Sequence, residues 1–425
     1  MKRSEFFRGT AAALGTLALS RGANAAPLRR LLQEAASGGN EDAFWQTVRD
    51  QFILDPDWTY LNFGGLGSMP LPVINSYQEF SRVEERAPTA GYDQKEWDGV
   101  KTKLAGLLGP ACRAEDLALI GCATEGINMI LNGLPLKKGD EVITSTHEHV
   151  ALKCPLLNRL HANGIVIRLF DPDLKSGRGN VDRIAGLINP RTRLIFLSHV
   201  TCTTGQVFPV KEISALARAK GIWFALDGAQ GPACIPFDIV EDGVDFYIAS
   251  AHKWLMGPKR TGFLYIRQGM LDILRPTVTG AGSSPTHNLK TGEFVLEPDA
   301  ARYEYGTQNE ALFFALGKAL DMIEAIGLPR ILKYSRGLAE AFYAGLKEIP
   351  GVDVLSPAEE ACRSCMISFR MARHDFTEIN CLMQKAHIRV RVVGEDDLNC
   401  IRVSFFICNS RSDVEHILAT LKTLV

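Results

Sequence analysis

Seven short apolar runs alternate with helical stretches between residues 117 and 266, and this alternation constrains the fold more than any other feature. The runs are rich in Ile, Val, Leu and Phe, and they lack strict alternation with polar residues. Such runs are typical of strands buried on both faces of a mostly parallel sheet. We therefore expect a layered α/β domain whose helices cover the sheet. The predicted strands are 117–120, 141–144, 165–169, 193–198, 222–226, 245–249 and 262–266.

The pattern differs on either side of this region. Residues 40–70 are loop-like, and two helices are expected after them, over 72–86 and 94–108. Beyond about residue 310 we expect a smaller α+β domain, with helices near 310–325, 329–348 and 411–424 and strands near 366–370, 388–393 and 400–406. The predicted organisation is an export signal (1–25), an N-terminal segment packing with the small domain (26–70), a large domain (71–305) and a C-terminal small domain (306–425).

The first 25 residues predict an export signal. A basic start precedes a short apolar segment over residues 9–20, and Ala23-Asn24-Ala25 is an A-x-A cleavage site. The string KRSEFFR resembles a twin-arginine signal, although Ser4 stands where the second arginine is expected. We expect a periplasmic or otherwise exported protein. An amphipathic N-terminal helix on a cytoplasmic protein is the alternative.

Charge and cysteine content exclude several classes of protein. The 425 residues include 47 Lys and Arg against 48 Asp and Glu, with no basic patch, so no nucleic-acid partner is expected. Ten cysteines are too few for a disulfide scaffold. No uninterrupted apolar run is long enough to span a membrane. The expected partner is a small-molecule substrate.

The segment Ser250–Pro258 (SAHKWLMGP) carries the strongest chemical signal and directly follows a predicted strand. The apolar neighbours of Lys253 predict partial burial, which disfavours the charged form of an amine and lowers its pKa. A neutral amine can attack an aldehyde and form a Schiff base.

Two further motifs follow predicted strands. Asp227 begins the string DGAQ at the carboxyl end of a strand, where open α/β sheets bind their ligands. Thr124 lies in ATEGIN, which opens a helix, and the free N–H groups of a helix start bind anions. Alone, Asp227 would be a turn residue and Thr124 an ordinary N-cap.

Together these segments resemble the class V aminotransferases among the fold-type I pyridoxal 5'-phosphate (PLP) enzymes. The resemblance covers residues 40–425 and rests on DGAQ, SAHKWLMGPKRTGFLYIR, ATEGIN and the His-Glu-His at 147–149. The isopenicillin N epimerase-like and cysteine desulfurase-like branch is the most similar, through YLNFGGLGSMP, GLPLKKGDEVITSTHEH, SHVTCTTGQVFPVKEI and NCIRVSFFICNS. It implies a seven-stranded, mostly parallel large-domain sheet.

The resemblance also implies a role for individual residues. Lys253 would bind PLP as a Schiff base and move the substrate Cα proton, and Asp227 would pair with the pyridine nitrogen. Arg402 would bind the substrate carboxylate, while Asn62 and Phe63 would line the substrate entrance. The other cofactor contacts implied are Gln230 and Cys202 near the phenolic oxygen, His149 on the ring face, and Ala123, Thr124, Ser250 and His252 at the phosphate, with Gly306 and Thr307 at the partner's phosphate in a homodimer.

The implied activity is PLP-dependent chemistry at Cα of an amino acid or an amino-acid-containing substrate. Reprotonation at the cofactor gives transamination, reprotonation of Cα from the opposite face gives epimerisation, and loss of a β-substituent gives a C–S lyase. A siderophore-tailoring enzyme of the same fold is a further alternative. The loop RVRVVGEDDLNC lacks the cysteine that class V desulfurases carry, which argues against a persulfide-forming desulfurase.

The remaining features favour structural roles. His147 and His149 lack the further ligands of a zinc site, so no metal is expected. The Cys362-x-x-Cys365 pair is incidental, or a disulfide if the protein is exported, and His199 is either a site residue or a core histidine. Arg389 or Arg391 would meet a substrate carboxylate or lie on a solvated face. A cofactor-free binding protein and a Rossmann oxidoreductase are the competing classes, and no strand-GxGxxG-helix unit supports the second.

Overall fold

A computed structural model of the chain describes residues 30, 32, 39–88 and 93–425. The predicted export signal lies outside these residues and stays a prediction. No helix within the described ranges combines the length and apolarity needed to cross a bilayer.

A seven-stranded sheet forms the centre of the large domain, in the order β2-β8-β7-β6-β5-β3-β4. Only β8 runs antiparallel to its neighbours, and the other six strands point the same way. The predicted mostly parallel sheet and fold type I architecture are therefore confirmed. The strands are β2 (Leu117–Ile120), β3 (Glu141–Ser145), β4 (Val166–Phe170), β5 (Thr192–Ser198), β6 (Trp223–Asp227), β7 (Phe246–Ser250) and β8 (Gly262–Ile266).

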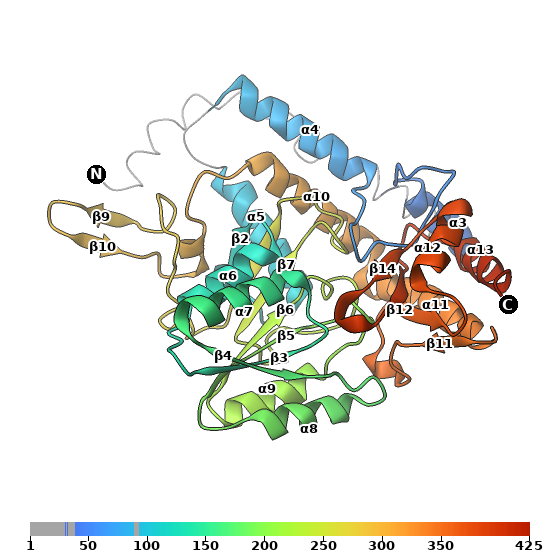
Figure 1. Cartoon of the computed structure of the whole chain (residues 1–425). Coiled ribbons are helices and arrows are strands. Elements are labelled where there is room, and N and C mark those ends of the chain that lie inside the picture. Colours follow the sequence, from blue (N-terminus) through green and yellow to red (C-terminus); the bar gives the residue numbers. More distant parts are fainter. Residues whose placement is uncertain (1–29, 31, 33–38, 89–92) are drawn as a thin grey trace.

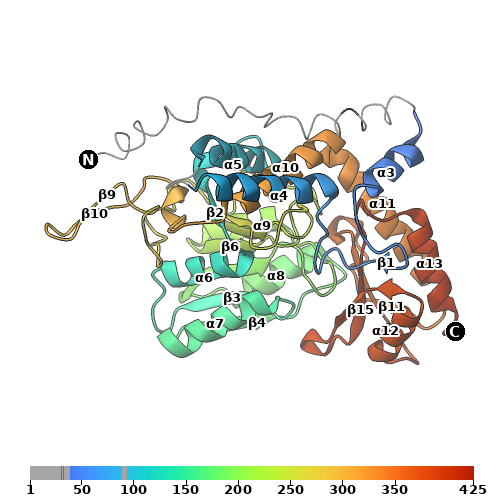
Figure 2. The same ribbon diagram turned by 90° about the horizontal axis from the view of Figure 1, so that it is seen from above.

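Two apolar cores enclose this sheet, because successive side chains of a strand point to opposite faces. On one face, strand residues such as Ala225 and Ile248 pack with α6 and α7. On the other face, Leu226 and Tyr247 belong to a larger core that also contains α5, α8, α9 and α10 and continues into the small domain. Figures 1 and 2 show helices on both sides of the sheet.

The helices predicted over 72–86, 94–108 and 310–325 lie within one residue of these bounds, and four further helices occupy the stretches between the strands. They are α4 (Leu71–Arg86), α5 (Gln94–Leu108), α6 (Ala123–Gly133), α7 (Val150–Asn163), α8 (Gly177–Leu187), α9 (Val210–Ala219) and α10 (Glu310–Ile326). Helix α10 packs against α4 and α5, although the predicted boundary at residue 306 assigns it to the small domain. The domain boundaries themselves stay predictions.

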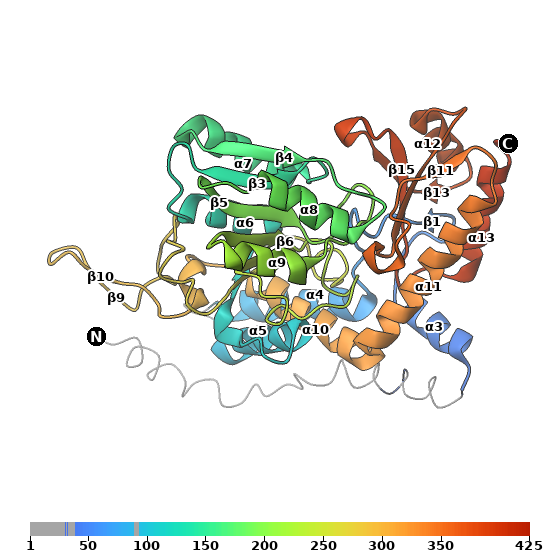
Figure 3. The same cartoon turned by 90° about the horizontal axis from the view of Figure 1, so that it is seen from below.

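A second sheet, of order β11-β12-β15-β14, lies beside the large domain (Figure 3). Its antiparallel strands are β11 (Val352–Val354), β12 (Met366–Met371), β14 (Arg391–Val393) and β15 (Cys400–Ser404), and its helices are α11 (Leu328–Lys347), α12 (Phe376–Lys385) and α13 (Arg411–Lys422). Strand β1 (Thr59–Tyr60) pairs in parallel with β13 (Ile388–Arg389), so the N-terminal segment joins this part of the molecule.

The structure also contains elements that the sequence patterns did not predict. Helix α3 (Glu41–Arg49) lies within the segment predicted to be loop-like, and it buries Phe44, Trp45 and Val48. A hairpin of β9 (Thr286–Asn288) and β10 (Glu293–Val295) projects from the large domain (Figure 3). Short 3-10 helices occur at η2 (Ala114–Asp116), η3 (Ala300–Tyr303), η4 (Glu360–Cys362) and η5 (Glu395–Asp397).

Phe63 lies in the larger core and tests how much the packing around it contributes to stability. Its ring is fully buried, with centroid distances of 4.6 Å to Phe406 and 6.0 Å to Trp254. We expect Phe63→Ala to lower the free energy of unfolding by about 3–5 kcal/mol, since it leaves a cavity. Phe294→Ala, in the exposed hairpin, should change it by less than about 0.5 kcal/mol. Urea denaturation measures both, and equal losses would contradict this account.

Candidate active site

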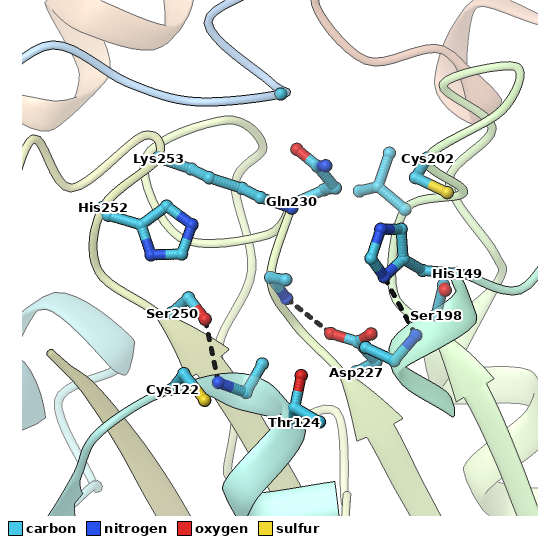
Figure 4. A pocket seen from close by; sticks show the side chains of 15 residues that line it. Cys122, Thr124, His149, Ser198, Cys202, Asp227, Gln230, Ser250, His252 and Lys253 are labelled. Carbon is cyan, nitrogen blue, oxygen red and sulfur yellow. Dashed lines mark hydrogen bonds between the residues drawn. The ribbon is translucent and has the colours of Figure 1, made fainter. Parts of the chain in front are cut away.

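A pocket opens at the carboxyl ends of the parallel strands, where the loops after β2, β3, β5, β6 and β7 converge (Figure 4). Its volume is about 650 Å³ including the part open to solvent. The residues that line it are Gly65, Cys122, Ala123, Thr124, His149, Ala151, Ser198, Val200, Cys202, Asp227, Ala229, Gln230, Ser250, His252 and Lys253.

Lys253 extends into this pocket from the loop after β7 (Figure 4). Burial lowers the pKa of its amine to about 8, although the Asp227 carboxylate acts in the opposite direction. Gly67 packs against the backbone of this loop, and its N–H donates to the carbonyl oxygen of His252 at 2.9 Å. A Cβ at Gly67 would lie 2.5 Å from the carbonyl oxygen of Lys253, so only glycine permits this close approach.

Asp227 ends β6, and its buried carboxyl lies at the floor of the pocket. Its Oδ1 accepts a hydrogen bond from the Ala229 N–H at 2.9 Å. Burial raises the pKa of this carboxyl, while the N–H of Ala229 and the Lys253 amine oppose the shift. A cationic group placed against Asp227 would therefore be favoured, because it would stabilise the ionised form.

The start of α6 forms the polar end of the pocket. The helix begins at Ala123 with Cys122 as N-cap, so Thr124 lies within the first turn and is not the cap. The Ala123 N–H donates to Ser250 Oγ at 2.8 Å, so this amide already has a partner within the chain. The hydroxyl proton of Ser250 remains available to donate to a ligand. His252 Nδ1 is buried and has no hydrogen-bond partner among the described residues.

His149 lies across the pocket from Lys253 (Figure 4). It is the N-cap of α7, and its Nδ1 accepts from the Ala151 N–H at 3.1 Å, which leaves the proton of a neutral ring on Nε2. Burial and then the positive charge of Lys253 lower the pKa of His149 to about 4. The ring is therefore neutral at pH 7.

Glu148 is a buried carboxyl that the sequence analysis used only as part of the resemblance. Its Oε1 accepts from Ser145 Oγ at 2.5 Å, and its Oε2 accepts from Ser198 Oγ at 2.5 Å and from the Ser198 N–H at 2.8 Å. Ser198 is in register with Asp227 on the neighbouring strand. Glu148 therefore ties together the ends of β3 and β5 beside the pocket floor. The sequence signal that could have identified Glu148 is the serine at the end of each of these two strands.

Gln230 is fixed by two hydrogen bonds within the chain. Its Oε1 accepts from Trp254 Nε1 at 2.7 Å, and its Nε2 donates to the Gly64 carbonyl oxygen at 2.7 Å. An amide nitrogen carries two protons, so the second proton of Nε2 is available to a ligand.

Arg402 reaches the region of the pocket from the small-domain sheet, although it does not line the cavity. Its guanidinium is buried, donating to the Cys202 carbonyl oxygen at 2.7 Å and to Asn62 Oδ1 at 2.9 Å. Its Nε has no partner among the described residues. Arg391, its cross-strand neighbour, also donates to the Cys202 carbonyl oxygen, at 2.9 Å, and pairs with Glu395.

The structure places several predicted site residues outside the cavity. Phe63 was expected at the substrate entrance, but its ring is fully buried in the aromatic cluster with Trp254 and Phe406, so it packs in the core. Asn62 contacts Arg402 and does not line the cavity. Gly306 and Thr307 also lie outside the cavity lining, and Thr307 is exposed.

The contacts of His199 and of the CxxC motif bear on the alternatives that the sequence left open. His199 is a core residue, since it is buried and its Nδ1 lies 3.0 Å from Tyr247 Oη. Within the described ranges, no three His, Cys, Asp or Glu side chains are grouped as metal ligands. Cys365 Sγ lies 3.2 Å from Cys234 Sγ, and Cys362 and Cys365 are both free thiols.

The pocket residues fit the PLP that the sequence resemblance implies. An amine with a lowered pKa and a buried carboxyl suit an aldehyde and a ring nitrogen. The polar end offers Thr124, Ser250 and a helix start, which are suited to a phosphate. The unsatisfied His252 Nδ1 is the buried polar atom that a ligand at this end would explain.

Comparisons with known proteins agree with this arrangement. The sequence profile of the family described as aminotransferase class-V matches residues 60–417. A cysteine desulfurase of Serratia proteamaculans is 29% identical over 86% of this chain and 93% of its own length. An isopenicillin N epimerase of Amycolatopsis lactamdurans is 29% identical over 89% of this chain and 98% of its own length.

Solved structures show the same likeness. A mutant of C-DES with glycine covalently linked to its PLP cofactor has a TM-score of 0.81 and 26% identity, covering 88% of this chain and 98% of that one. The cystine C–S lyase C-DES in complex with its reaction product, cysteine persulfide, has a TM-score of 0.79 and 25% identity, over 86% of this chain and 98% of that one.

The environment of Lys253 predicts how its amine titrates. With a pKa of about 8, about one tenth of the amine is neutral at pH 7, compared with about 3 in 10,000 at the ordinary value of 10.5. We expect competitive acetylation of the cofactor-free protein to give a midpoint near pH 8 for Lys253. The midpoint should fall further in Asp227→Asn, because the anion that favours the ammonium is lost.

Exposed Lys259 serves as the reference amine in the same digest. A Lys253 midpoint near 10.5, unchanged by Asp227→Asn, would contradict the burial argument.

Proposed function

Since the chain belongs to the class V aminotransferase family of PLP-dependent enzymes, we propose that it acts at Cα of an amino acid or an amino-acid-containing substrate. The observation that carries this proposal is the placement of the Lys253 amine and the Asp227 carboxyl in one pocket. Their order along the chain and their positions after β7 and β6 match the resemblance.

We propose that Lys253 binds the PLP aldehyde and that Asp227 holds the pyridine nitrogen in its protonated form. His149 would cover one face of the ring, since its neutral imidazole lies opposite Lys253. Gln230, already held by Trp254, would direct its free proton to the phenolic oxygen. The phosphate would be bound by Thr124, Ser250 and His252, with the Ala123 N–H acting indirectly, because it donates to the Ser250 hydroxyl.

The bound cofactor supplies an electron sink that stabilises negative charge at the substrate Cα. As a free amine in this pocket, Lys253 would take the Cα proton of the substrate as a general base. A pKa near 8 suits that role at neutral pH. The Asp227 carboxylate supports the step by keeping the ring nitrogen protonated.

Arg402 is proposed to bind the substrate carboxylate. A guanidinium offers a planar fork that fits a carboxylate. The contacts of Arg402 to Cys202 and Asn62 fix the guanidinium beside Cys202, which lines the pocket, and its Nε lacks a partner among the described residues. Substrate specificity would then depend on the small-domain sheet that carries it.

The fate of the Cα carbanion separates epimerisation, transamination and C–S bond cleavage. Relatives in both the epimerase and the desulfurase groups match the chain to a similar degree. The loop between Arg391 and Arg402 carries Glu395, which pairs with Arg391, and contains Cys400 only within buried β15. This arrangement argues against a desulfurase that carries a persulfide on this loop.

Exchange of the Cα proton with solvent deuterium tests the proposal, because it is common to all three outcomes. We expect the holoenzyme to show the visible absorption of lysine-linked PLP and to exchange the Cα proton of a substrate found by screening amino acids and peptides. Lys253→Ala should lose the visible band and about 10²–10⁴-fold or more of the exchange rate. Keto acid, inverted stereochemistry or sulfide then identifies the outcome.

Lys259→Ala is the matched control for that experiment, since Lys259 is exposed and lies outside the pocket lining. A colourless protein that does not respond to added PLP would contradict the proposal, as would exchange that survives in Lys253→Ala.

We further propose a homodimer in which Gly306 and Thr307 reach the phosphate of the partner's cofactor. The exposure of Thr307 outside its own pocket is consistent with such a contact. Sedimentation should give twice the mass of one chain. Thr307→Glu should weaken retention of PLP, because it brings a carboxylate toward a phosphate. A monomer that retains PLP and turns over substrate would contradict the proposal.

A further inference from the structure

Two buried thiols from distant parts of the chain meet at the boundary between the large and small domains. Cys234 Sγ and Cys365 Sγ lie 3.2 Å apart, and Cys365 Sγ lies 3.8 Å from the Cys234 carbonyl oxygen. The two residues are separated by 131 positions in the sequence. Both side chains are buried and both are free thiols here.

Each of these cysteines lies next to an element of the proposed active site. Cys234 belongs to the loop after β6, four residues beyond Gln230, and its N–H donates to the Gly231 carbonyl oxygen at 3.0 Å. Cys365 directly precedes β12, and its carbonyl oxygen accepts from the Phe405 N–H at 3.0 Å. Strand β12 pairs with β15, the strand of Arg402.

The alternative partner for Cys365 is its CxxC neighbour, and the structure does not favour it. Cys362 lies in η4, where its Sγ faces Gly177 of α8: a Cβ at Gly177 would lie 2.9 Å from that sulfur. Cys362 and Cys365 are thus directed to different parts of the large domain. The short CxxC spacing is incidental, and the sulfur that Cys365 approaches comes from the DGAQ loop.

We propose that Cys234 and Cys365 are a redox-sensitive cross-linking site, which forms a disulfide between the loop after β6 and the small-domain sheet. In this step the two S–H bonds break and one S–S bond forms. Two electrons and two protons pass to a two-electron thiol oxidant such as a small disulfide, which is reduced to two thiols. The product holds the sheet of Arg402 at a fixed position against the Gln230 loop.

The buried position makes this pair a slow site in the folded protein. Burial raises the pKa of the Cys365 thiol well above its ordinary value, and the neighbouring sulfur adds to the shift. Thiol–disulfide exchange requires a thiolate and access for the oxidant, so a small oxidant and long incubation are required. Once formed, the cross-link closes a long loop and restricts the unfolded chain.

The test uses the holoenzyme with its two exposed cysteines, Cys154 and Cys381, replaced by serine to prevent reaction at the surface. Ten cysteines minus these two leaves eight. After incubation with bis(2-hydroxyethyl) disulfide, we expect the thiols that react with N-ethylmaleimide in denaturant to fall from eight to six. Peptide mapping should find Cys234 linked to Cys365, and the urea midpoint should rise and return to its starting value with dithiothreitol.

Variants at each cysteine separate this pair from other reactions. Cys234→Ser and Cys365→Ala should each retain all remaining thiols and show no shift of the urea midpoint on oxidation, whereas Cys408→Ser should behave like the parent. An unchanged thiol count would overturn the proposal. So would a Cys362–Cys365 peptide, or a mixed disulfide with the reagent at Cys234 or Cys365 in place of the cross-link.

Discussion

The burial of an amine and a carboxyl in one pocket is the constraint on which the site depends. Water stabilises both ions, and its removal disfavours both. The pKa of Lys253 therefore falls and that of Asp227 rises, while the attraction between the two groups opposes each shift. Asp227 ends β6 and accepts from the Ala229 N–H, and Lys253 lies in the loop after β7, so that each ion is stabilised by the charge of the other. The pocket is thus prepared for a ligand that supplies both an electrophile and a cation.

The central sheet holds the site residues in this arrangement. Six strands run in the same direction, so their carboxyl ends meet at one edge, and the site residues arise from five of the loops there, those after β2, β3, β5, β6 and β7. Glu148 strengthens this edge, because one buried carboxyl accepts from the serines that end β3 and β5. The Tyr247 ring packs so closely under the DGAQ loop that a Cβ at Gly228 would lie 2.0 Å from it. The residue after Asp227 must therefore be glycine, because a side chain there would collide with the Tyr247 ring.

Much of this could be predicted from the sequence, because buried parallel strands produce apolar runs that single-sequence patterns detect. All seven strands of the large sheet lie within one residue of their predicted ends, and Lys253, Asp227 and Thr124 line one pocket. The features that could not be predicted depend on contacts between segments that are distant in the sequence. Helix α3 is short and is stabilised by packing, and the burial of Phe63 follows from Phe406, over 300 residues away. The pairing of Cys365 with Cys234 likewise has no local signal.

Residues 59–67 connect the two sheets to one site. At one end of this segment, the Leu61 N–H donates to the Arg389 carbonyl oxygen at 2.8 Å, and the Leu61 carbonyl oxygen accepts from the Ser404 N–H at 2.8 Å. At the other end, Gly64 and Gly67 bond to Gln230 and His252 of the large domain. The segment thereby places Arg402 of the small domain relative to Lys253. These bonds use backbone atoms of the segment, while its side chains Asn62 and Phe63 add a contact to Arg402 and packing in the core. Gly67 is needed because the chain passes so close to the backbone of Lys253.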